Sequence, residues 1–191
     1  MAIQYRPEID GLRAIAVASV IIYHADILIN GHKMLAGGFF GVDVFFVISG
    51  FLITSLMISE FDKTGIISIS AFYERRARRL LPALLVVMVA SLPFAWLYLL
   101  PSQLIDFSKS LLSSLFFGSN VYWHFSLQEY GVESSLLKPF LHTWSLAVEE
   151  QFYIVFPLVF LAMYKWFKSQ VTVLLAAGFI LSFMFAVCVV A

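Results

Sequence analysis

The sequence predicts an all-α protein that crosses a membrane several times. Of its 191 residues, 61% are hydrophobic and 13% are charged, whereas a soluble domain is roughly 45–50% apolar and about 25% charged. The mean hydropathy is +0.92, and apolar stretches long enough to cross a hydrocarbon core of about 30 Å recur along the chain. We expect about five transmembrane helices that form part of a larger helical bundle, with no soluble domain within residues 1–191.

The first expected span, residues 12–29, carries an arginine and a histidine that transmembrane helices normally avoid. Arg13 and His24 are eleven positions apart, about three helical turns plus 20°, so they share one face at a separation of about 16 Å. Asp10 falls near the same stripe. An ionisable side chain that faces lipid costs several kcal/mol, so we expect this stripe to face protein or a wet cavity. Asn30 and Gly31 are expected to end the span.

The second expected span covers residues 38–58. It opens with closely spaced glycines, which allow backbones to approach each other. Asp43 lies within it and has two open interpretations: a polar group near the membrane surface, or a functional carboxylate.

Four arginines precede the third expected span, residues 82–100. Arg75, Arg76, Arg78 and Arg79 place this side in the cytoplasm by the positive-inside rule, and the N-terminus lies on the same side because two spans precede them. Arginines at this position often only set orientation or contact anionic lipid. They can also clamp phosphate groups, because guanidinium binds phosphate oxygens in bidentate fashion.

Residues 102–123 are long enough to span but contain many polar side chains. If this segment crossed the membrane, Lys165 and Lys168 would fall on the outside, against the distribution of the arginines. We therefore expect a re-entrant or interfacial segment. Pro82 is well placed to open the span before it, at the first helical position.

The fourth and fifth expected spans cover residues 145–164 and 171–191. His142 and Trp144 precede the fourth span, which carries Glu149 and Glu150. Consecutive residues point about 100° apart on a helix, so only one of the two carboxylates is expected to point straight inward. Both could instead be ordinary charges at a helix N-terminus, stabilised by about 0.3–1 kcal/mol.

His24 can be a packing partner in a helix interface, a proton relay or a general base, for which an ordinary pKa near 6.5 is suitable. The four histidines are scattered, without the paired spacing of a zinc site, so we expect no metal. No pattern in the sequence indicates nucleic-acid binding.

Four stretches, in this order, resemble the acyltransferase-3 family of membrane acyltransferases. They are residues 5–17, which open the pattern of an arginine and a histidine with ten residues between them; residues 40–52; the run 76–79 before Pro82; and residues 142–153. The first and last are most similar to the subgroup in which an extracytoplasmic domain of the SGNH type follows, as in bacterial O-antigen and peptidoglycan O-acetyltransferases. The family's membrane domain has about ten spans, so residues 1–191 would be its N-terminal part.

The resemblance implies an enzyme of the bacterial inner membrane that moves acetyl from cytoplasmic acetyl-CoA to a hydroxyl of an extracytoplasmic glycan or glycolipid. It implies that Arg13 and His24 belong to the reaction centre. Arg76 and Arg79 would hold the phosphates of the acyl donor. The further partners it implies are membrane lipid, the remaining membrane helices and a downstream SGNH-type domain.

From these residues we hypothesise that Arg75 and Arg78 assist the phosphate clamp. His24 would act as general base or accept the acyl group, and Glu149 would orient it or relay its proton.

Two other functions remain open from the residues alone. A proton-coupled transporter or flippase would also use an intramembrane Arg, His and Glu set. A truncated, inactive fragment is the third possibility.

Overall fold

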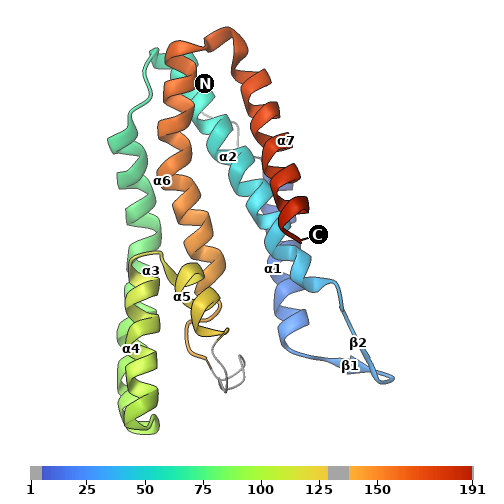
Figure 1. The fold of residues 1–191 in the computed structure, drawn as a ribbon, viewed down its shortest axis with the longest axis vertical. Coiled ribbons are helices and arrows are strands. Elements are labelled where there is room, and N and C mark those ends of the chain that lie inside the picture. The colour runs from blue at the N-terminus through green and yellow to red at the C-terminus, as the bar shows by residue number, and fades with distance from the viewer. Residues whose placement is uncertain (1–5, 129–137, 191) are drawn as a thin grey trace. The chain divides into compact units, whose positions relative to one another are not determined.

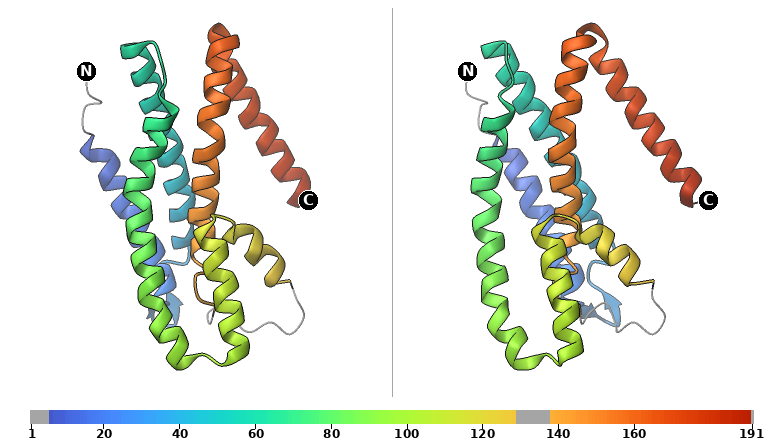
Figure 2. Two further views of the ribbon diagram at one scale, coloured as in Figure 1. Left: turned by 90° about the vertical axis from the view of Figure 1, so that its left-hand side faces the viewer. Right: turned by 60° about the vertical axis from the view of Figure 1, so that its left-hand side comes forward.

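The computed structural model describes residues 6–128 and 138–190, and the chain divides into two compact units, residues 1–151 and 152–191. Figures 1 and 2 show the course of the chain. The helices and strands are α1 (Pro7–His24), β1 (Leu28–Ile29), β2 (His32–Lys33), α2 (Gly41–Thr64), α3 (Ile69–Tyr98), α4 (Pro101–Leu115), α5 (Ser119–Ser126), α6 (Thr143–Trp166) and α7 (Val171–Val190). Short 3-10 turns, Gly38–Phe40 and Lys168–Gln170, precede α2 and α7.

Four stretches of the described chain are long and apolar enough to cross a membrane: Gly38–Thr64, Ile69–Tyr98, Thr143–Trp166 and Val171–Cys188. The prediction of an all-α multi-pass membrane protein is therefore confirmed, with one hairpin of two two-residue strands as the exception. The helix α1 would be the fifth span. It is 18 residues long, about 27 Å, and three charged residues lie in its first half. Its crossing of the membrane stays a prediction.

The expected first span, residues 12–29, is wrong in its bounds, because α1 begins at Pro7 and ends at His24. Leu28–Ile29 pairs instead with His32–Lys33 in an antiparallel hairpin. The two residues between these strands, Asn30 and Gly31, have φ values of 53° and 80°. Asn-Gly is the preferred pair for a tight hairpin turn, in which both central residues need positive φ. The residues read as the end of a span are thus a hairpin turn.

The helices α1 and α2 pack closely through two glycines. A Cβ atom added to Gly41 would lie 2.4 Å from the carbonyl oxygen of Ala16 and 2.8 Å from Cγ2 of Val20. One added to Gly38 would lie 2.3 Å from the carbonyl oxygen of Ser19. The expected close backbone approach is confirmed, and it brings the middle of α1 against the start of α2.

The helix α3 is continuous over 30 residues, from Ile69 through the arginine cluster to Tyr98. It begins after Ser68, whose hydroxyl accepts a hydrogen bond from the backbone N–H of Ala71, as a helix N-cap does. Pro82 therefore lies inside the helix and does not open it, contrary to the prediction. Because the N-cap lies before the arginines, the four arginines and the apolar span belong to one continuous helix.

The helices α4 and α5 form from the ambiguous segment 102–123. Within the first unit α4 runs back beside α3, and α5 then turns away from it (Figure 2). A buried cluster joins α3 and α4 through Leu84, Met88, Ala95 and Phe107, and Phe140 completes it. Neither α4 nor α5 is among the candidate spans, and α4, at 15 residues, is only about 22 Å long.

The start of α6 is fixed to α4 and α5 by side-chain hydrogen bonds. Gln151 donates from Nε2 to the carbonyl oxygen of Phe117, at 2.7 Å, and to Oδ1 of Asn120, at 2.9 Å. The hydroxyls of Ser114 and Thr143 lie 2.7 Å apart, and both are buried. Buried polar groups are costly unless they are paired, so these bonds set the position of the first turns of α6 within the first unit.

The second unit consists of the remainder of α6, the turn Lys168–Gln170 and α7. The expected fifth span, residues 171–191, corresponds to α7. Along α6 the rings of Phe152 and Phe156 stack with centroids 4.7 Å apart. These residues lie four positions apart and therefore on one helix face.

Candidate active site

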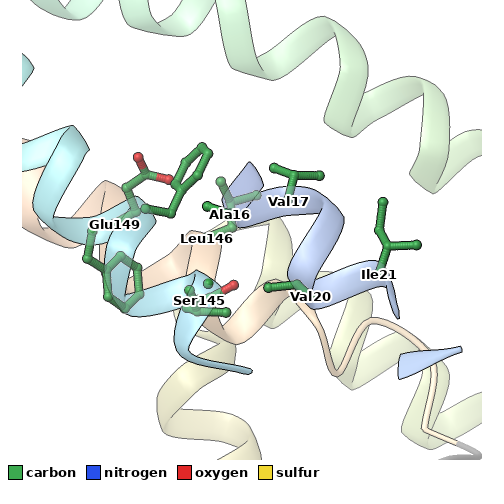
Figure 3. A pocket seen from close by; sticks show the side chains of 11 residues that line it. Ala16, Val17, Val20, Ile21, Ser145, Leu146 and Glu149 are labelled. Carbon is green, nitrogen blue, oxygen red and sulfur yellow. The ribbon is translucent and has the colours of Figure 1, made fainter. Parts of the chain in front are cut away.

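A cavity of about 260 Å³ lies between α1, the start of α2 and the first turns of α6. Figure 3 shows its wall from α1, with Ala16, Val17, Val20 and Ile21, and its wall from α6. The α6 wall supplies the polar side chains, the Glu149 carboxylate and the Ser145 hydroxyl. The remaining lining residues are Gly41, Val42, Phe45, Phe46 and Leu146. A mostly apolar chamber with a few polar groups is the usual composition of a small-molecule site.

Arg13 lies beside this cavity. Its guanidinium carbon is 5.1 Å from the centroid of the Phe45 ring, a cation–π contact, and Phe45 lines the cavity. The Nε atom of Arg13 is buried and has no hydrogen-bond partner among the described residues. A buried donor without a partner costs about 1–3 kcal/mol. An acceptor from a ligand would relieve that cost.

His24 ends the same stripe of α1. Its Nδ1 lies 2.9 Å from the carbonyl oxygen of Val20, a cavity residue. Because a carbonyl can only accept, this bond places the proton of a neutral imidazole on Nδ1 and leaves the Nε2 lone pair available. The α1 residues between Arg13 and His24 that pack on Gly41 are Ala16 and Val20. The His24 side chain is exposed and does not line the cavity, so a face shared by Arg13 and His24 stays a prediction.

His142 lies directly before α6 and close to His24. Its pKa is lowered, chiefly because burial disfavours the charged form, and further because a protonated His24 repels a second positive charge. Part of the side chain nevertheless remains exposed. The two histidines, 118 positions apart in the sequence, therefore lie in the same part of the first unit, at the end of α1.

Glu149 points into the cavity and is held from α2. The Ser49 hydroxyl donates a hydrogen bond of 2.5 Å to Oε1 of Glu149, and Ser49 is only 3% exposed. A hydrogen bond to an ionised carboxylate is among the stronger ones in proteins. Ser49 thereby orients the carboxylate that the cavity contains.

Glu150 points to α3 instead. Nη2 of Arg76 donates a hydrogen bond of 2.7 Å to Oε1 of Glu150, with side chains 23% and 9% exposed. Of the two carboxylates, one was expected to point straight inward. Both face the interior of the first unit, because each has a partner on a different helix.

The arginine cluster is divided rather than uniform. Arg75 lies 3.5 Å from Glu60, and Arg78 forms an exposed pair of 2.7 Å with Glu74, one turn before it. Arg79 is exposed and has no ion pair within the described part of the chain. Arg76 is therefore committed to the helix interface, whereas Arg79 is open to a ligand from outside.

The other polar candidates lie outside the cavity. Asp10 is exposed in the first turn of α1, and Asp43 is exposed in the first turn of α2. Carboxylates at these positions are stabilised by the helix dipole. Trp144 is 41% exposed, one residue after the start of α6. The described residues hold no group of three or more His, Cys, Asp or Glu side chains that could bind a metal ion.

Sequence reasoning missed Ser49, Phe45 and Gln151, which hold Glu149, Arg13 and the start of α6 respectively. The signal for Ser49 is weak: a small polar residue before a glycine in an otherwise apolar helix. The signal for Gln151 is the third consecutive polar residue after Glu149 and Glu150 in an apolar run.

With this geometry established, comparison with known proteins decides the family. A family model described as an acyltransferase domain matches residues 6–190, nearly the whole chain. The chain belongs to the acyltransferase-3 family. The resemblance drawn from the four sequence motifs is thereby confirmed.

Curated relatives of this acyltransferase-3 chain include the O-acetyltransferase OatA of two Staphylococcus aureus strains, NCTC 8325 / PS 47 and COL. Each is 42% identical over 167 residues, which is 87% of this chain and 26% of the relative. The acyltransferase-3 chain thus spans about a quarter of the length of the curated relatives it matches. No solved structure matches it.

Proposed function

We propose that this chain is part of a membrane O-acetyltransferase that moves an acetyl group from acetyl-CoA to a hydroxyl of a glycan on the other side of the membrane. The observation that carries the proposal is the apolar cavity between Arg13 and His24 in a member of the acyltransferase-3 family. The names of the OatA relatives support O-acetyl transfer. The membrane would be a bacterial inner membrane, with the arginine cluster on its cytoplasmic side by the positive-inside rule.

The donor would bind at the arginine end of α3. Arg79 is open to solvent, and Arg75 and Arg78 lie within four positions of it, so three exposed guanidinium groups are available for the phosphates of acetyl-CoA. Arg76 contributes from the interior, where Glu150 holds it. The acetyl thioester would then enter the apolar cavity, where the buried Nε of Arg13 can donate to the carbonyl oxygen.

His24 would act as the general base. With the proton on Nδ1, its Nε2 can remove the proton from the acceptor hydroxyl as the hydroxyl oxygen attacks the thioester carbonyl. The carbon–sulfur bond then breaks, and the imidazolium returns the proton to the leaving thiolate. Glu149, oriented by Ser49, lines the cavity beside Val20, whose carbonyl oxygen bonds to His24, and its carboxylate would favour the positive charge that develops on the imidazole.

Nucleophilic attack by Nε2 itself would give an acetyl-imidazole intermediate before transfer to the acceptor. Rapid acid quenching of the chain with acetyl-CoA, followed by intact-mass measurement, distinguishes the two routes. Only the covalent route adds one acetyl mass, and that mass disappears with His24→Ala.

Binding of acetyl-CoA to the chain in lipid nanodiscs tests the donor site. We expect Arg79→Gln to weaken binding about tenfold, since a charge-assisted phosphate contact contributes about 1.5–3 kcal/mol. Lys63→Gln removes an exposed charge at the same end of the helices and should leave the affinity unchanged. Absence of binding by the unsubstituted chain would instead favour a transporter, which has no use for the thioester.

The His24→Ala variant tests the chemistry. It should bind acetyl-CoA nearly as well as the unsubstituted chain but lose hydrolysis of the thioester and transfer to a glycan acceptor. Transfer that persists in this variant would remove His24 from the reaction. Tyr23→Phe, at the neighbouring position on α1, is the matched control.

A further inference from the structure

A second cavity, of about 160 Å³, lies at the end of α3 that is opposite to the arginine cluster. It is lined by Gln103, Asp106 and Phe107 of α4, Trp123 of α5, and Lys138 and Pro139 of the segment before α6. Arg79 and Leu99, which also contacts this cavity, are 20 positions apart on one helix, or about 30 Å. The proposed donor site and this cavity are therefore about one hydrocarbon thickness apart.

The cavity combines a fixed aromatic ring with a pair of opposite charges. Trp123 is 4% exposed, and its Nε1 donates to the carbonyl oxygen of Phe140 at 3.3 Å, which fixes the plane of the ring. Nζ of Lys138 and Oδ2 of Asp106 lie 4.0 Å apart, with side chains 12% and 54% exposed. This spacing is too long for a strong hydrogen bond, so the Asp106 carboxylate can still accept from a ligand.

This set of groups matches the chemistry of one sugar ring. An indole offers a flat apolar surface to the C–H face of a pyranose, while a carboxylate accepts from hydroxyls and an ammonium donates to them. The two opposite charges compensate each other, which favours a neutral ligand. A volume of 160 Å³ is below the roughly 300–1,000 Å³ of sites for drug-sized ligands, so the cavity fits one ring rather than an acyl-CoA.

A short stretch of chain connects this cavity to the proposed reaction centre. Lys138 and Pro139 line the sugar-sized cavity, and Ser145 and Glu149 line the acyl cavity. His142 lies between them, with its ring centroid 6.5 Å from that of Phe140 and its pKa influenced by His24.

We propose that the cavity of Asp106, Trp123 and Lys138 is a binding site for a single neutral pyranose ring of the acceptor glycan. This inference rests on the proposed function, which supplies the acceptor. It adds the residues that recognise the acceptor and the charge class of the sugar. A ring bound here is presented beside the segment that leads to His142 and His24.

Saturation-transfer NMR with N-acetylglucosamine, on the chain in nanodiscs, tests the site. We expect saturable binding in roughly the millimolar range, as for a ligand of few atoms. Asp106→Asn and Trp123→Phe should each weaken binding at least fivefold. The matched controls Asp62→Asn and Trp96→Phe, which change exposed residues elsewhere, should leave binding unchanged. Asp106 is exposed, so its substitution keeps the test valid if Trp123→Phe impairs folding.

Absence of saturable binding, an equal loss in the controls, or equal binding of the open-chain polyol sorbitol would each overturn the proposal. Acetyl-CoA binding is measured on the same samples. Donor binding without sugar binding would overturn only the sugar site. Sugar binding without donor binding would confirm the sugar site and overturn acetyl transfer.

Discussion

The arginine end, Arg75 to Arg79 on α3, and the histidine end, His24 and His142, handle positive charge in opposite ways. At the arginine end the cations meet carboxylates at several degrees of burial, from the interior pair with Glu150 to the exposed pair with Glu74. At the histidine end, His24 bonds to a backbone carbonyl, and a protonated His24 disfavours protonation of His142. One end is therefore suited to bind anions at any physiological pH, and the other to keep an imidazole neutral.

The largest expected effect is on the free energy of unfolding, when the interior pair of Arg76 and Glu150 is broken. Glu150→Ala leaves the Arg76 guanidinium half-buried without its carboxylate. Breaking a fully buried pair costs about 3–5 kcal/mol, and the partial exposure of Arg76 reduces this to about 2–3 kcal/mol. The free energy of unfolding in mixed detergent–SDS micelles is the measurement. Glu74→Ala removes the exposed pair and should cost less than about 1 kcal/mol; equal costs would mean that burial does not distinguish the two pairs.

The next effect concerns the packing behind the histidine end. Gly41→Ala places a Cβ against the backbone of Ala16, which cannot yield as a flexible side chain would. We expect a loss of about 1–3 kcal/mol from overpacking, measured as a lower unfolding temperature. Gly50→Ala is the control on the same helix, where nothing lies within 4 Å, and it should be neutral or stabilising. An unchanged unfolding temperature in Gly41→Ala would contradict the close packing of α1 on α2.

A smaller effect tests the role of the Glu149 carboxylate. Ser49→Ala removes the hydroxyl that donates to Glu149, at a cost of about 1 kcal/mol, since hydrogen bonds between membrane helices contribute about 0.6–1.7 kcal/mol. Thioester hydrolysis should fall more than acetyl-CoA affinity, because Glu149 lies in the cavity and not among the arginines proposed to bind the phosphates. Ser108→Ala, which removes an exposed hydroxyl bonded within its own helix, serves as the comparison. A matching decline in affinity would place Glu149 at the donor site instead.

The smallest effect is electrostatic. His24→Gln removes one of the two causes that lower the pKa of His142, so this pKa should rise part of the way towards its ordinary value, while burial still keeps it low. Histidine-selective NMR titration follows it directly. Because the folded state disfavours protonated His142, its contribution to stability is present above the ordinary pKa near 6.5 and is lost as the pH falls below it. An unchanged titration of His142 in this variant would mean that His24 does not influence the pKa of His142.

The sequence was most informative where one periodicity governs one element. The apolar runs of α2, α6 and α7 predicted spans, and the closely spaced glycines before α2 predicted the close approach of two backbones. It was less informative where a turn or a helix cap overrides the apolar pattern. Asn30 and Gly31 form a hairpin turn, a signal that was present but interpreted as the end of a helix. Ser68 caps α3 so far upstream that Pro82 falls inside the helix.

The tertiary contacts of the site could not be predicted from one sequence. Arg76 and Glu150 are 74 positions apart, and Ser49 and Glu149 are 100 positions apart. No local pattern specifies which of the acidic residues an arginine will meet across a bundle. The helical repeat predicted that the neighbouring carboxylates of Glu149 and Glu150 point in different directions. Only the packing of α2, α3 and α6 selects the partner of each.

The adjacency of Glu149 and Glu150 on α6 has a mechanical consequence. One peptide unit joins the carboxylate that holds Arg76 to the carboxylate inside the acyl cavity. If the donor binds at the arginine end as proposed, an anion that drew the Arg76 guanidinium away would leave Glu150 buried and uncompensated. Any rotation of α6 that rehydrated Glu150 would also move Glu149 against its hydrogen bond to Ser49 on α2, so the proposed donor site and the cavity would be coupled through two adjacent residues.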